Sequence, residues 1–394
     1  SVEDLRTIDT VTATANAALP KAGGTLTGNL ATAGISAVTA GTSNFVAGVN
    51  AGNSIVSGGN YNTVVGDEAG TAITTGDDNV AVGASALSAN TTGRRNIAIG
   101  YKALTAVTSG ERNTAVGWKA LEDATGSSNT ALGEQALLNN TTASDNTAVG
   151  AGSLANTTTG ASNTAVGKAS LLANTTGTQN TASGFESLKA NTTGQNNIST
   201  GFQSLLSNTT GNDNCAVGVQ ALRDNTTAGN NTGIGAFALR VNTTGTRNTA
   251  VGALSLDANT TGNYNTANGY NTLGANTTGG YNSGFGDSAL VNNTTGVRNS
   301  AVGHAALLDN TTGNYNTAIG METLVNNTTG SYNTALGNEA LKTVTTVNDL
   351  TAVGFTALRD NTSGTSNTAV GKASLRVNTT GSGNTGVGLL TLSA

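Results

Sequence analysis

The sequence predicts an all-β fold, a parallel β-solenoid of about twenty coils with seventeen residues each. Three observations predict it. The stretch "NTAVGKASLLANTTGTQ" (163–179) returns in nearly the same form every seventeen residues to the end of the chain. Each repeat carries a glycine at its fifth position, and all but the first carry a leucine at the ninth. Such a chain stacks similar units instead of building one irregular pocket.

The repeats can be written as N-T-A-V-G-x-x-A-L-x-x-N-T-T-G-x-x, with positions numbered one to seventeen. They begin at Asn62 and continue to the repeat that starts at Asn384, and Leu350 replaces the opening asparagine once. The repeat from Asn113 has sixteen residues, and its deletion falls in the predicted loop. Residues at one position of successive coils are called a column below.

The chain divides into three segments. Residues 1–20 predict a short helical or coiled-coil lead-in, because Leu5, Ile8, Ala15 and Leu19 lie near a three-four spacing that Thr12 interrupts and Pro20 ends. Residues 21–61 predict a connector, in which "NFVAG" at Asn44 is a candidate for a degenerate first coil. Residues 62–394 form the repeat region.

Each position of the coil has a physical interpretation. Position three is almost always Ala, Ser or Gly and predicts a narrow interior, whereas the leucine of position nine predicts the apolar core. Glycine at position five predicts a tight corner with positive φ or close backbone approach. The N-T-T-G segment predicts a second corner whose glycine adopts left-handed geometry. Two short strands are expected, one at "TAV" and one at "xAL".

Seventeen residues are too few for a helical hairpin repeat or a leucine-rich repeat. Stacked coils rise about 4.8 Å each, which predicts a rod on the order of 95 Å. One leucine and a few small residues are a weak core for seventeen ordered residues, so a homotrimer is expected to supply the missing cover. We expect position nine to fill each chain's own core and position four to face the trimer axis. There Asn268 would form a polar ring of three copies.

Composition excludes several classes of function. Only 10% of residues are charged, the net charge is −5, and no basic stripe predicts nucleic-acid binding. No apolar run reaches the ~18 residues of a membrane span, so no membrane insertion is expected. A single cysteine forbids an intrachain disulfide. No cofactor site is predicted.

Candidate catalytic groups are few, and the sequence predicts no enzyme. His304 is the single histidine and falls at position six, where an exposed edge is expected. Cys215 replaces threonine at position two and is interpreted as a small buried residue. No cluster of ligands predicts a metal site. A glycosidase needs two facing carboxylates, and the densest acidic group of the sequence is the candidate for such a pair. A solvated corner is the simpler interpretation of this group, which consists of Glu111, Glu122, Asp123 and Glu134.

Aromatic residues recur at two positions. Position six carries six of them, and position seventeen carries four tyrosines: Tyr264, Tyr281, Tyr315 and Tyr332. Two interpretations remain open for these tyrosines, packing of neighbouring rings along the solenoid or platforms on which the sugar rings of a glycan stack.

The string "NTAVGxxAL" resembles the "SVAIGxxA" head repeat of YadA-type trimeric adhesins over residues 62–394, although those coils are shorter. The resemblance implies a left-handed β-roll and trimeric packing. The segment "LPKAGGTLTGNLATAG" (19–34) is similar to "KxGGTMTGxL", a motif of bacteriophage tail fibres.

Together these resemblances imply the shaft of a trimeric phage tail fibre in the virion tail, which holds a receptor-binding tip away from the virion. Expected partners are tail proteins at the N-terminal end and a host cell-surface glycan or protein. The main alternative is a bacterial trimeric autotransporter adhesin at the cell surface. An ice-binding solenoid, suggested by the recurring threonines, and a polysaccharide depolymerase are the remaining alternatives.

Overall fold

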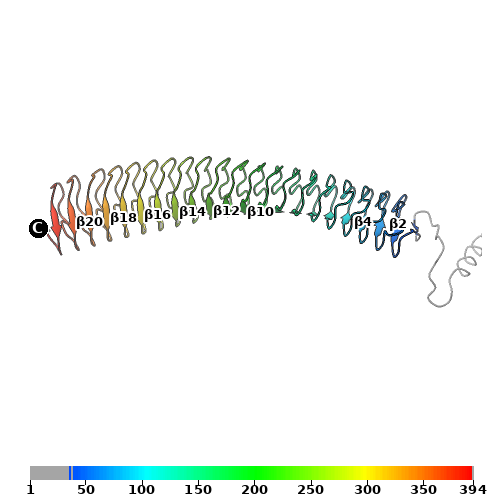
Figure 1. Cartoon of the computed structure of the whole chain (residues 1–394). Coiled ribbons are helices and arrows are strands. Elements are labelled where there is room, and N and C mark those ends of the chain that lie inside the picture. Colours follow the sequence, from blue (N-terminus) through cyan, green and yellow to red (C-terminus); the bar gives the residue numbers. More distant parts are fainter. Residues whose placement is uncertain (1–34, 37–38, 393–394) are drawn as a thin grey trace, which may run out of the picture. The chain divides into compact units, whose positions relative to one another are not determined.

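The computed structural model describes residues 35–36 and 39–392, which fall into two compact units that meet in sequence at Thr142 and Ala143. Each unit is described by itself. The described residues form strands, turns and bends, without any helix (Figure 1). They accordingly include no helix that is long and apolar enough to span a membrane. The lead-in predicted over 1–20 and the fibre-type motif of 19–34 lie outside the described residues.

The described residues of unit 1 form seven short strands. They are β1 (Ile35–Ser36), β2 (Phe45–Ala47), β3 (Thr63–Val65), β4 (Val80–Val82), β5 (Ile97–Ile99), β6 (Thr114–Val116) and β7 (Thr130–Leu132). From β2 to β7 each strand pairs with the next in parallel and in register. β2 therefore belongs to a coil that begins at Asn44. β1 pairs with β2 in the opposite, antiparallel direction and covers that edge of the sheet.

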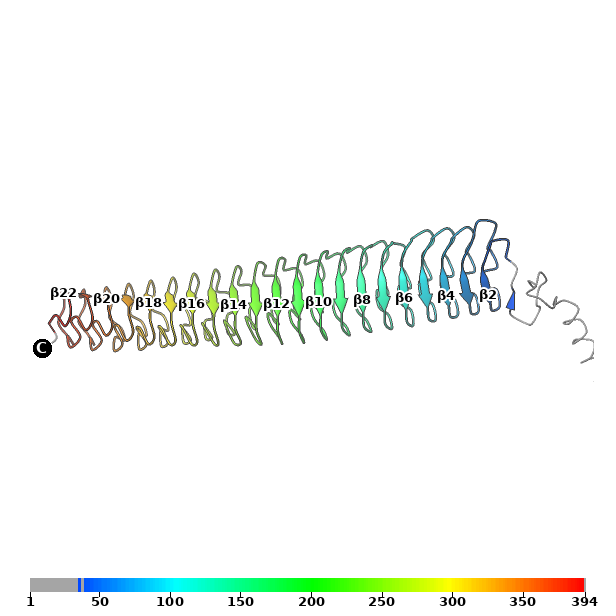
Figure 2. The same cartoon turned by 90° about the horizontal axis from the view of Figure 1, so that it is seen from below.

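Unit 2 repeats the same arrangement over fifteen parallel strands, each three residues long (Figure 2). Neighbouring strands lie about 4.8 Å apart, as in any parallel sheet. They are β8 (Thr147–Val149), β9 (Thr164–Val166), β10 (Thr181–Ser183), β11 (Ile198–Thr200), β12 (Cys215–Val217), β13 (Thr232–Ile234), β14 (Thr249–Val251), β15 (Thr266–Asn268), β16 (Ser283–Phe285), β17 (Ser300–Val302), β18 (Thr317–Ile319), β19 (Thr334–Leu336), β20 (Thr351–Val353), β21 (Thr368–Val370) and β22 (Thr385–Val387).

The prediction of a parallel β-solenoid with about twenty 17-residue coils is confirmed, but the prediction of two strands per coil is wrong. Only positions two to four form a strand. In the "xAL" segment the residues of positions seven and nine have positive φ, as Phe237 (φ 60°) and Leu239 (φ 52°) illustrate. Left-handed residues interrupt an extended chain, so this side of the coil is a succession of turns.

The core of each coil is narrow and apolar on one side. The leucines of position nine are fully buried from Leu87 to Leu358, and the alanines of position three are buried beneath the strand. Within the strand only the middle residue points inward, because successive side chains alternate between the two faces. The residues of positions two and four therefore face outward.

The left-handed backbone explains why position nine is never valine or isoleucine, although both are common at position four. A β-branched side chain is strongly disfavoured at positive φ. We expect Leu239→Ile to lower the free energy of unfolding by about 2 kcal/mol, although the volume is unchanged. Leu239→Met keeps an unbranched Cβ and should cost less. Urea unfolding of both variants checks this, and equal losses would contradict the backbone explanation.

The other side of the core is polar and was not predicted. The asparagines of position twelve form a buried ladder in which each side chain donates to the one before it. Asn242 Nδ2 donates to Asn225 Oδ1 (2.9 Å) and to the carbonyl of Gly245 (2.9 Å), and Asn242 Oδ1 accepts from Asn259 Nδ2 (2.8 Å). This ladder runs without interruption from Asn174 to Asn327.

The opening asparagines form a second buried ladder. The backbone N–H and Nδ2 of Asn180 both donate to Asn163 Oδ1, at 3.0 and 3.1 Å, and Nδ2 also donates to the carbonyl of Gly194. Buried amides are stable only when they are hydrogen-bonded, and the seventeen-residue period supplies an identical partner at every step. The two ladders take the place of part of an apolar core.

The two corner glycines of the coil have different roles. Gly235, at position five, has φ +135° and stacks directly on Gly252 of the next coil, as predicted for a tight corner. Gly177, at position fifteen, does not have the predicted positive φ. A Cβ at Gly177 would overlap the Oδ1 of Asn174 and the carbonyl of Gly194. The glycine there makes room for the buried asparagine.

Candidate functional site

The outward side of the strands carries exposed apolar side chains. Position four is occupied mainly by Val, Ile and Leu, and Val302 is a typical example with 42% of its surface exposed. Position six adds large exposed side chains, including Phe185, Phe202, Tyr270 and Phe355. These two columns, called the apolar face, form a long exposed apolar surface along the described residues of unit 2.

Polar and apolar residues compensate one another on the apolar face. The three coils with a polar residue at position four carry an aromatic residue at position six, in the pairs Ser183 with Phe185, Thr200 with Phe202, and Asn268 with Tyr270. Conversely, the coil with Phe285 at position four has Asp287 at position six. Other coils, such as that of Val353 and Phe355, are apolar at both positions, so every coil of unit 2 keeps at least one apolar side chain in these columns, which favours a covered surface.

Asn268, the residue predicted to form a ring at the trimer axis, lies at the end of β15 and is exposed on the apolar face. Leu273 of the same coil is fully buried in the chain's own core. Position four thus faces away from the core of its own chain. The ring itself involves further copies and stays a prediction.

The four tyrosines of position seventeen belong to a continuous exposed stack over six coils of unit 2. Its order is Arg247, Tyr264, Tyr281, Arg298, Tyr315 and Tyr332, and this set is called the arginine–tyrosine ladder. The sequence interpretation identified the tyrosines but missed the arginines. The signal was present, because Arg247 and Arg298 occupy the same position of their coils.

Every neighbouring pair in the ladder is in contact, either ring on ring or guanidinium over a ring. The rings of Tyr264 and Tyr281 lie 4.8 Å apart at 8°, and those of Tyr315 and Tyr332 lie 5.0 Å apart at 7°. The guanidinium of Arg298 lies between the rings of Tyr281 (5.6 Å) and Tyr315 (5.2 Å). Inside the ladder the faces on which a sugar would stack are therefore occupied, which disfavours the stacking mode considered for a glycan.

Arg247 and Arg298 also donate hydrogen bonds from Nη1 to the hydroxyls of Tyr264 and Tyr315, respectively. Among the described residues, neither arginine has a carboxylate within ion-pair distance, whereas each of the other four arginines of unit 2 lies within 4.0 Å of one; these are Arg223, Arg240, Arg359 and Arg376. The ladder thus holds two exposed positive charges that its own described surroundings do not neutralise.

The residues considered for catalysis are scattered. His304 is exposed, with Nε2 3.4 Å from Asp287 Oδ2. Cys215 was expected to be buried, but it is half-exposed on the outward side of β12, and partial burial raises the pKa of its thiol. A thiol with a raised pKa is a poor nucleophile, because less of it is thiolate.

The acidic group does not form a pair of facing carboxylates. Glu111, Glu122, Asp123 and Glu134 stand at positions sixteen, ten, eleven and six of their coils. Glu122 is held by Lys119 (3.0 Å) and Lys102 (3.8 Å). Among the described residues, no group of three or more His, Cys, Asp or Glu side chains could hold a metal ion.

The threonines considered for ice binding are partly used inside the fold. At position thirteen the hydroxyl of Thr175 donates to the carbonyl of Thr192 in the next coil (3.1 Å), and the same bond recurs along the column. Threonines of position fourteen, such as Thr176, remain exposed.

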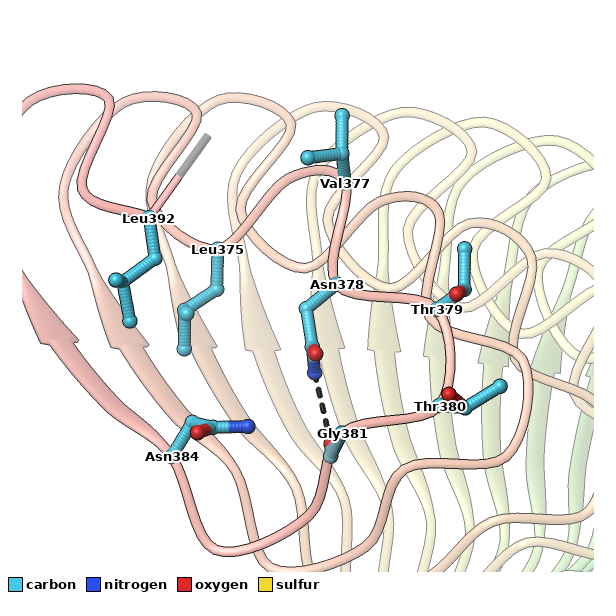
Figure 3. Close-up of a pocket in the computed structure, with 8 residues that line it drawn as sticks. All are labelled: Leu375, Val377, Asn378, Thr379, Thr380, Gly381, Asn384 and Leu392. Carbon is cyan, nitrogen blue, oxygen red and sulfur yellow. Dashed lines mark hydrogen bonds between the residues drawn. The ribbon is translucent and has the colours of Figure 1, made fainter. Parts of the chain in front are cut away.

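A cavity of about 330 Å³ lies at the last described coils (Figure 3). Its walls include Leu375 and Leu392 on one side and the corner from Asn378 to Gly381 on the other, where Asn378 Nδ2 donates to the carbonyl of Gly381 (2.8 Å). These groups are the ones that contact the following coil elsewhere in unit 2. The cavity is therefore lined by surfaces that are used for coil stacking elsewhere, and none of its lining residues is charged.

Comparison with known proteins found no matching family model and no matching curated protein.

Proposed function

We propose that this protein is the structural shaft of a trimeric phage tail fibre, which holds a receptor-binding tip away from the virion for attachment to the host cell. The observation that carries the proposal is the long series of nearly identical coils with a continuous apolar face. Repeated coils supply length without a catalytic centre, and the apolar face supplies a surface through which copies can associate.

Three copies in parallel would explain both features of the apolar face. A polar residue such as Asn268 is tolerable at a threefold axis, because three amides can hydrogen-bond to one another or hold a water. Three chains also present any tip in three copies, and multivalent attachment raises the overall affinity without new contacts. The resemblance of the 19–34 motif to tail fibres favours the virion over the bacterial surface.

The proposal predicts a mass in solution three times the 38.6 kDa of the chain, measured by sedimentation equilibrium at micromolar concentration. It also predicts that the Cys215 side chains of the three parallel chains, on the outward side of β12, lie close together at the same level along the fibre axis. Oxidation at mildly alkaline pH, which offsets the raised pKa of the thiol, should then link pairs of chains by a disulfide.

The matched control is Cys215→Ser combined with Thr210→Cys, which moves the thiol to an exposed corner of the coil before β12. This variant should not form linked chains. A stable folded monomer, or faster linkage at position 210 than at 215, would reject the trimer packed through the apolar face.

A further inference from the structure

We propose that the arginine–tyrosine ladder of unit 2 is a lateral binding strip for an acidic polysaccharide, a glycan chain that carries carboxylates. This function goes beyond a shaft, which needs length and association but no ligand along its side. It does not depend on the oligomeric state or on the virion assignment.

The first argument is the local backbone. Position seventeen of the coils has positive φ, between 56° and 69°. Other coils of unit 2 use residues that tolerate this conformation, such as Asn196, Asn230, Asp349 and Gly383. Six consecutive coils place Arg or Tyr there instead, and the positive φ of these residues strains the backbone. Stacking of exposed rings contributes about 0.5–1.5 kcal/mol per pair, which offsets this strain without a clear net gain in stability. Departures from local preference of this kind are expected at functional sites.

The second argument is charge. Arg247 and Arg298 are exposed and have no carboxylate partner in the part of the chain that the structure describes, in a protein whose net charge is −5. Nη1 of each arginine donates to a tyrosine hydroxyl, so the Nε and Nη2 donors of the planar guanidinium remain for a ligand. Planar carboxylates fit such a pair of donors with two parallel hydrogen bonds. The two arginines are three coils apart, about 14 Å along the solenoid, so they suit separate carboxylates of one polymer better than a small anion.

The third argument decides between kinds of polymer. Single-stranded nucleic acids bind by stacking bases on open aromatic faces, and the faces inside this ladder are occupied by one another. An extended peptide binds through free backbone groups, but here the backbone N–H of Tyr264 already donates to Thr246 and that of Tyr281 to Asn263. What remains exposed is a row of ring edges, hydroxyls and guanidinium edges, which suits the hydroxyls and carboxylates of an acidic glycan.

The test uses the full chain and immobilised polygalacturonate, a polysaccharide with one carboxylate per sugar, at low and at physiological salt. We expect saturable binding that weakens with salt, because the contacts are exposed ion pairs. Arg247→Gln combined with Arg298→Gln should reduce the affinity about tenfold or more, since each arginine loses a charge-assisted hydrogen bond. Arg359→Gln, which removes an arginine paired with Asp360, is the matched control and should bind as the unchanged protein does.

Three outcomes would overturn the proposal. They are the absence of polygalacturonate binding, equal loss in the Arg359→Gln control, and binding of polyuridylate or polyglutamate as tight as that of polygalacturonate. Thermal melting establishes that each variant is folded. If the double variant does not fold, Arg298→Lys is measured in its place. This variant keeps the charge but loses the flat guanidinium edge, so unchanged binding rejects the proposal and reduced binding supports it.

Discussion

Gly235→Ala is expected to lower the free energy of unfolding by about 3 kcal/mol or more, a large effect for a single added methyl group. Gly235 has φ +135°, a conformation that other residues rarely adopt. The new Cβ would also lie 2.6 Å from the carbonyl carbon and oxygen of Gly252 in the next coil. Backbone atoms cannot move aside as a flexible side chain can, so neighbouring coils would have to separate.

Gly152→Ala is the matched control, because Gly152 also has positive φ (+65°) but open space around it, with Leu172 Cδ1 nearest at 3.6 Å. Ala169 occupies the same position one coil later with φ 56°. Chemical unfolding should therefore show a small change for this variant. Similar losses for both glycine variants would mean that backbone conformation alone, without the close stacking of position five, explains the glycine column.

The repeat period, the leucine column and the corner at position five could be predicted from the sequence, because each follows from one residue type kept through about twenty coils. The strand predicted at "xAL" was wrong for a definite reason. Left-handed residues at positions seven and nine interrupt the extended chain, and the adjacent Ala238 and Leu239 are both buried, whereas successive side chains of a strand alternate between its two faces. The restriction to leucine at position nine was the available signal, since a true strand would accept Val and Ile.

The asparagine ladders were not predicted from the sequence, because the N-T-T-G segment is typical of a turn and a turn alone accounts for its asparagine. The clue lay in the whole column. Position twelve is Asn in ten successive coils, from Asn174 to Asn327, as constant as the threonines of positions thirteen and fourteen, whereas positions sixteen and seventeen at the end of the same turn segment vary widely. A turn tolerates several residue types, but a chain of amides that pair with one another tolerates only asparagine.

The arginine–tyrosine ladder was partly predictable. Tyrosines at one position of neighbouring coils must come close, since the column spacing is about 4.8 Å. Whether the ring faces are free for a ligand or covered by neighbouring side chains depends on the side-chain orientation, which the repeat period does not specify. The role of the arginines rests on contacts that the period does not specify, because Arg298 lies between two rings and has no carboxylate partner among the described residues.

Asn242→Val is expected to lower the free energy of unfolding by roughly 2–4 kcal/mol, because it removes three buried hydrogen bonds in the middle of the position-twelve ladder. The shape is acceptable in this column, where Val344 is fully buried in another coil. The cost therefore comes from the partners left behind. Asn225 Oδ1 and the carbonyl of Gly245 each lose a donor, and Asn259 Nδ2 loses an acceptor.

Asn327→Val is the matched control at the end of the same ladder. Asn327 Nδ2 donates to Asn310 Oδ1 and to the carbonyl of Gly330, but its Oδ1 faces the coil of Val344 and has no hydrogen-bond partner. The control therefore removes one hydrogen bond fewer and leaves no donor unpaired, so it should cost about 1 kcal/mol less than Asn242→Val. Urea unfolding of the two variants measures this difference directly. If Asn327→Val costs as much as Asn242→Val, the asparagines act as separate corner residues, and the pairing between coils does not stabilise the solenoid.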